Sequence, residues 1–186
     1  MEKTFASGHV ADGQQSTFTI RLHNDSTTPI TTNAPLIDSP IDGGGNGGLR
    51  LTPVVGASSL SCSNGGSGTV AANGVNGIQA DADFTIPANG HCDIVVAFTG
   101  QAGTAGITPY TNTVASQQVA ADLWTQARSA TVSIVDILRV TKSRLPTHVA
   151  PGNPVQYAVN VYNYSDTQRS NVRVQDLLQN GSRYLP

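Results

Sequence analysis

The stretch KTFASGHVADGQQSTFTIRLHNDS, residues 3–26, returns later in the chain as KSRLPTHVAPGNPVQYAVNVYNYS, residues 142–165. The two passages start 139 positions apart (142 − 3) and align without a gap. Internal repetition of this kind indicates a structural unit that is used more than once. The repeat predicts one module over residues 1–136 and a second, incomplete module over residues 137–186.

The second half of each copy has the alternation of a β-strand. Apolar side chains occupy every second position there, namely Phe18, Ile20, Leu22, Tyr157, Val159 and Val161. A period of two places these side chains on one face of a strand. The dipeptides at residues 12–13 and 151–152, which end in glycine, predict a turn before that strand.

Further strands are expected along the rest of the first module, separated by short segments rich in Gly, Asn and Pro. The strand-like segments are residues 49–55, 78–86, 92–98, 110–114 and 130–140. Residues 114–130 are expected to form a long loop with one helical turn. This pattern predicts an all-β fold, a β-sandwich followed by part of a second one.

The composition excludes several classes of function. Charged residues make up 12% of the chain and the formal net charge is −2, so no basic surface for nucleic acid is predicted. No apolar run approaches the roughly 20 residues of a membrane span. No nucleophile with a neighbouring base can be named, so we expect neither an enzyme nor a cofactor.

Several motifs carry a resemblance to a known family. They are Lys142 followed by VAPGNPVQYAVNVYN and VQDLLQNG, and in the first module CSNGGSGTVAANG, FTIPANGHCDIVVAF and YTNTV. Their order resembles the conserved tandem-repeat domain, of unknown function, of bacterial surface and adhesin-like proteins. The resemblance implies an immunoglobulin-like sandwich, an extracellular or cell-surface location and no catalytic activity.

The two cysteines, Cys62 and Cys92, are predicted to form a disulfide. Each lies at the junction of a turn and a strand, and disulfides belong to the oxidising compartments outside the cytosol. The alternative is a pair of buried free thiols. Two isolated cysteines lack the paired spacing of a zinc site, and no metal site is expected.

Lys3 recurs as Lys142, which leaves two interpretations open. A lysine on the first strand of each module is commonly salt-bridged or solvated and protects a sheet edge. Alternatively, Lys3 forms an amide bond with the side chain of Asn112, as in isopeptide-bonded pilin and adhesin domains. That chemistry needs a buried, uncharged lysine and a nearby acid, for which Asp38 is the candidate.

Two loops are candidates for ligand binding. Residues 38–48 carry Asp38, Asp42 and Asn46, but at a spacing unlike that of calcium loops, so a solvated turn is expected. Residues 116–127 carry Trp124, which either stacks on a sugar or belongs to the core.

The sequence therefore predicts a structural segment of an extracellular bacterial stalk or fibre. Its expected partners are neighbouring repeats or subunits, which could add strands to the unfinished module. The alternative is an adhesin module that binds a glycan or a host protein through its loops.

Overall fold

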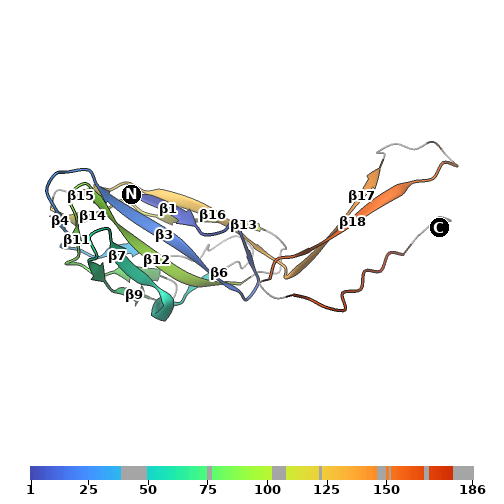
Figure 1. Cartoon of the computed structure of the whole chain (residues 1–186), viewed down its shortest axis with the longest axis horizontal. Coiled ribbons are helices and arrows are strands. Elements are labelled where there is room, and N and C mark those ends of the chain that lie inside the picture. Colours follow the sequence, from blue (N-terminus) through green and yellow to red (C-terminus); the bar gives the residue numbers. More distant parts are fainter. Residues whose placement is uncertain are drawn as a thin grey trace. The chain divides into compact units, whose positions relative to one another are not determined.

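The computed structural model describes residues 1–38, 50–74, 77–101, 108–121, 123–145, 150, 152–165 and 168–177 (Figure 1). The chain divides into two compact units, Met1–Asp136 (unit 1) and Ile137–Pro186 (unit 2). The described elements are β-strands apart from one short 3₁₀ turn, Val55–Ala57. No helix in the described part of the chain combines the length and the apolar character that a membrane crossing needs.

The largest sheet of unit 1 is antiparallel and has six strands (Figure 1). The first five follow the order β1 (Glu2–Phe5), β3 (Gln15–Asn24), β12 (Gly90–Gln101), β7 (Ser59–Cys62) and β8 (Ser67–Gly68). The sixth, β6 (Arg50–Pro53), also pairs with β12. The long β12 is thus the strand around which this sheet is built.

Smaller sheets complete the sandwich. One orders β13 (Thr108–Val114), β16 (Arg128–Val135) and β2 (His9–Ala11), with β2 parallel to β16. Another orders β5 (Leu36–Asp38), β10 (Gly77–Ala80) and β9 (Val70–Asn73). The remaining pairs are β4 (Ile30–Thr31) with β11 (Thr85–Ile86) and β14 (Gln117–Ala120) with β15 (Leu123–Thr125).

The expected all-β sandwich is confirmed, with one correction. The described residues of the segment 114–130 contain no helical turn, although their loosely helical spacing indicated one. They include the β14–β15 hairpin, in which Gln117 pairs with Thr125 and Gln118 with Trp124. Val119 is fully buried there, so an apolar contact with the core holds the segment as strands in place of a helix.

The core lies between the sheets and follows the alternation seen in the sequence. Every second residue of β3 from Phe18 onward is buried, and Ile20 faces Ile94 directly across the sheet. Gly100 at the end of β12 permits the close approach of β16. A Cβ atom there would lie 2.7 Å from Cδ1 of Ile134, closer than real contacts allow.

The disulfide between Cys62 and Cys92 joins two neighbouring strands of the large sheet. The two residues are direct cross-strand partners in β7 and β12, with Cα atoms 3.9 Å apart. Cys92 is fully buried and Cys62 nearly so. The bond therefore fixes the β7–β12 register from inside the core.

Unit 2 contains one antiparallel hairpin, β17 (Leu138–Leu145) with β18 (Gln156–Asn163). Residues 168–177 follow β18 and belong to no strand. The hairpin exposes many apolar side chains, including Val140, Tyr157 and Val159. In the described part of unit 2, nothing covers them.

Removing the disulfide should destabilise unit 1. The bond closes a loop of 30 residues, so in the chain-entropy model its loss costs about 3–4 kcal/mol of unfolding free energy. We expect this difference between the wild type and the Cys62→Ser/Cys92→Ser variant in chemical denaturation without reductant. Equal unfolding midpoints for the two proteins would contradict it.

Candidate functional site

Lys3 occupies a position where the fold calls for an apolar residue. On β1 the side chain of Lys3 points inward, and its cross-strand partner on β3 is the core residue Ile20. The Lys3 side chain is wholly buried. A lysine is rarely buried to this degree unless it is paired, so its partners define a site.

Asp38 and Asn112 are those partners. The Nζ atom of Lys3 lies 2.5 Å from Oδ2 of Asp38, and Nδ2 of Asn112 donates to the same oxygen at 2.9 Å. Asp38 is fully buried and Asn112 nearly so. The three side chains form one cluster inside unit 1, here called the Lys3 cluster.

The cluster connects three sheets. Lys3 comes from β1 of the large sheet, Asp38 from the end of β5, and Asn112 from the middle of β13. On β13 the buried residues alternate, with Tyr110 and Val114 on either side of Asn112. Asn112 thus takes an inward position by the same period of two that buries Lys3.

The burial of the cluster shapes its electrostatics. Burial lowers the pKa of Lys3 below its ordinary value of 10.5, because the charged ammonium loses its hydration, and the nearby Asp38 opposes this shift only in part. Among the described residues, Oδ1 of Asp38 and Oδ1 of Asn112 are buried without a hydrogen-bond partner. Buried polar atoms without a partner are costly.

Phe18 covers the lysine. The Nζ atom of Lys3 lies 4.4 Å from the centre of the Phe18 ring, and Phe18 in turn packs against Phe5 and Phe98. The aromatic side chains keep water from the amine. An amine, a side-chain amide and a carboxyl group thus share one buried site, and amide exchange between the first two would require the amine in its neutral form.

The sequence pointed to all three members of the cluster, and the structure brings them together. The alternation of residues 18–22 placed Phe18 on the inner face, but only the structure shows that its ring lies over the lysine. Asp38 belongs to β5 and faces the core, not a solvated turn; Asp42 and Asn46 lie outside the described residues.

Trp124 lies apart from the Lys3 cluster, on the β14–β15 hairpin. Its side chain is exposed, with 65% of its surface accessible, so it is not a core residue. It borders a shallow hollow of about 210 Å³ lined also by Met1, Leu22, His23, Leu123, Thr125, Gln126 and Arg128.

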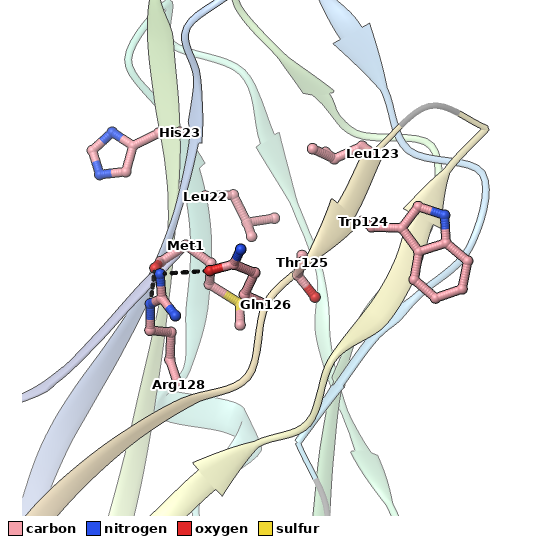
Figure 2. Close-up of a pocket in the computed structure, with 8 residues that line it drawn as sticks. All are labelled: Met1, Leu22, His23, Leu123, Trp124, Thr125, Gln126 and Arg128. Atoms are coloured by element: carbon pink, nitrogen blue, oxygen red, sulfur yellow. Dashed lines mark hydrogen bonds between the residues drawn. The ribbon is translucent and has the colours of Figure 1, made fainter.

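Hydrogen bonds from Arg128 connect two other residues that line the hollow. Arg128 donates to the carbonyl oxygen of Met1 at 2.9 Å and to Oε1 of Gln126 at 3.2 Å. Figure 2 shows the indole of Trp124 directed away from Met1 and Arg128. The ring is therefore available on the surface beside the hollow and not inside it.

Comparison of the chain with protein-family models, with curated protein sequences and with solved structures finds no match in any of the three. The candidate site therefore stands on its geometry.

The lowered pKa of Lys3 predicts a pH dependence of stability. Between the folded pKa and 10.5 the unfolded chain holds more protons on Lys3 than the folded chain, so stability rises with pH in this window. We expect this rise in an Asn112→Ala variant, which cannot form an amide bond to Lys3. Denaturant unfolding from pH 7 to about pH 10 measures it.

The matched control is the Lys3→Met/Asn112→Ala double variant, which keeps every other titrating group. The unfolding free energy of this double variant should rise less with pH over the same window. Superimposable profiles for the two variants would contradict the assignment of the lowered pKa to Lys3.

Proposed function

We propose that unit 1 is a covalently cross-linked structural repeat of an extracellular stalk or fibre on a bacterial surface. The observation that carries this proposal is the Lys3 cluster, in which an amine, an acid and an amide meet in a dry core. The tandem repeat, the disulfide and the resemblance to adhesin-like repeat domains support it. Its partners would be neighbouring repeats of the same kind.

In this proposal Lys3 and Asn112 form an amide bond once the unit has folded. Lys3 passes its proton to Asp38, which removes both buried charges. The neutral Nζ attacks Cγ of Asn112, while protonated Asp38 donates a hydrogen bond to Oδ1 of the amide, which rotates to accept it. The exchange of amide oxygen and nitrogen positions needs only a rotation of the side chain.

The step balances without any co-reactant. The bond between Cγ and Nδ2 of Asn112 breaks, a bond between Cγ and Nζ of Lys3 forms, and Nδ2 leaves as ammonia with the proton that Nζ gives up. Asp38 relays this proton; when it also gives up the proton that it first took from the Lys3 ammonium, the nitrogen leaves as ammonium and Asp38 is again a carboxylate. Each site reacts only once, so the reaction produces a permanent structural bond and the site does not turn over like an enzyme.

The bond would bear force along the chain. It would join the first strand of unit 1 to β13, so a pull on the ends of the unit would bypass the 108 residues between the linked positions, residues 4–111. The disulfide lies within that bypassed segment. At an extended length of about 3.5 Å per residue, the bond would reduce the length that the unit gains on forced unfolding by roughly 380 Å.

The intact mass tests the bond directly. Under reducing conditions we expect the wild type to be lighter than its sequence mass by one ammonia, because Nδ2 of Asn112 has left. The variants Lys3→Met, Asp38→Ala and Asn112→Ala should have their full sequence masses. Trypsin should also fail to cut after Lys3 in the wild type, since an acylated lysine is not recognised.

An asparagine outside the cluster provides the control. Asn73 lies at the end of β9, and an Asn73→Ala variant should still lose one ammonia. A wild type with its full sequence mass would refute the covalent bond and leave a buried ion pair.

A second candidate function rests on the exposed Trp124. An exposed indole beside a polar hollow can stack on a sugar ring, which favours a glycan-binding role. The bottom of the hollow offers the hydrogen-bonding groups of Thr125, Gln126 and Arg128.

Replacing Trp124 separates this role from a structural one. Since the side chain is exposed, Trp124→Ala should change the unfolding free energy by less than about 0.5 kcal/mol. If the protein binds glycans here, the variant should lose its signal on a glycan array, whereas Trp124→Tyr should keep part of it. No wild-type signal on the array would end this candidate.

A further inference from the structure

The hairpin of unit 2 repeats the first strand pair of unit 1 in its register. In unit 1, Lys3 pairs with Ile20 across β1 and β3, and in unit 2, Lys142 pairs with Val159 across β17 and β18. Both members of the second pair lie 139 positions after their counterparts. The repeat seen in the sequence is therefore also a repeat of strand pairing.

The polar contact of the lysine is repeated as well. The Nζ atom of Lys142 lies 2.6 Å from Oδ2 of Asp176, and 4.2 Å from the centre of the Tyr157 ring. Tyr157 corresponds to Phe18 at the offset of 139, and Asp176 lies 138 positions after Asp38. Unit 2 thus holds two of the three members of a second cluster, under the same kind of aromatic ring.

The turns that follow the two hairpins agree with this correspondence. The backbone N–H of Ser26 donates to Oδ1 of Asn24 at 3.0 Å, and that of Ser165 donates to Oδ1 of Asn163 at 3.0 Å. The chain therefore leaves β3 and β18 in the same way. This likeness supports treating the segment that leads to Asp176 as the counterpart of the one that leads to Asp38.

The two units differ in how far other strands bury this face of the strand pair. The inner face of β3 is at most 2% exposed, whereas its counterparts Tyr157, Val159 and Val161 are 41–49% exposed. In unit 1 this face lies in a core to which β12, β13 and β16 contribute. Among the described residues of unit 2, no strand corresponds to these three, and none carries a counterpart of Asn112.

We propose that the open face of unit 2 takes strands with the chemistry of β12, β13 and β16, and that Lys142 then forms an amide bond with an asparagine on the strand that corresponds to β13. This inference rests on the bond proposed for unit 1. The inference adds three points to that proposal: a second bond-forming site in unit 2, the kind of strand that would complete this site, and the asparagine that would react there.

The chemistry of the occupant follows from unit 1. The Lys142–Asp176 pair is neutral as a whole, so an uncharged polar group fits beside it better than a further charge. On β13 that group is the Asn112 amide, between the buried side chains of Tyr110 and Val114. The complementary strand should therefore carry an aromatic residue two positions before its Asn and an aliphatic residue two positions after it. Its apolar residues would cover the exposed face.

Bond formation in unit 2 would follow the same balanced step. Lys142 gives its proton to Asp176, Nζ attacks the side-chain amide carbon of the incoming asparagine, and one ammonia leaves. Before the strands arrive, Lys142 and Asp176 are 37% and 45% exposed at the side chain, so both groups are in contact with water. Covering the pair would both supply the amide and remove the water.

The test appends to the chain a copy of the segment that carries β6 to β16 in unit 1. Residue 186 corresponds to residue 48 at the offset of 138, so a copy of residues 49–136 is fused after Pro186. The extended protein should lose two ammonia molecules under reducing conditions, one from each unit. Tandem mass spectrometry of the digest should find Lys142 joined to the appended copy of Asn112.

Three variants make the result specific. Lys142→Met, or Asn112→Ala in the appended copy alone, should reduce the loss to one ammonia, whereas Lys3→Met should leave only the loss from unit 2. A protease-resistant extended chain that loses a single ammonia would overturn the inference. So would an appended segment that stays protease-sensitive, because the inference requires the face to accept these strands.

The failure of this inference is distinguishable from that of the bond in unit 1. The ammonia lost through Lys3 is measured on the original chain, without any extension. If that loss occurs and the second does not, only the site in unit 2 is refuted. If neither Lys3 nor Lys142 forms an amide bond, both proposals are refuted.

Discussion

The structure of unit 1 depends on a lysine in the core. A charged ammonium removed from water is costly, and a contact with a carboxylate compensates only when the geometry is close. Lys3 meets this condition through Asp38, which also accepts a hydrogen bond from Asn112. The requirement to pair this one side chain fixes β1, β5 and β13 relative to one another, and with them three sheets.

The disulfide and the Lys3 cluster constrain the fold in different ways. Cys62 and Cys92 are neighbours within one sheet, so their bond strengthens a pairing that backbone hydrogen bonds already define. The Lys3 cluster acts between sheets, which are otherwise joined by side-chain packing and by hydrogen bonds such as that from Arg128 to the carbonyl oxygen of Met1. An amide bond at that place would add what a sandwich lacks, a covalent connection across its core.

Unit 2 shows what the same residues do without a cover. Lys142 keeps an aspartate and an aromatic ring as neighbours, yet all three remain open to water. Burial, which changes the lysine from a solvated cation into a group with a lowered pKa, is provided in unit 1 by strands from elsewhere in the chain. The difference between the two units lies in the strands that surround the site and not in the lysine and aspartate themselves.

The sequence by itself determined the β-strands, because a period of two is visible wherever one face is buried. It also determined the repeat at an offset of 139, and it named Cys62 with Cys92 and Lys3 with Asp38 and Asn112 as pairs worth testing. It failed at residues 116–127, where the contact of Val119 with the core overrides a weakly helical spacing. Only the tertiary structure decided that Lys3, Asp38 and Asn112 meet, because residues 35 and 74 positions apart are brought together by strand pairing and layer packing, which no local pattern records.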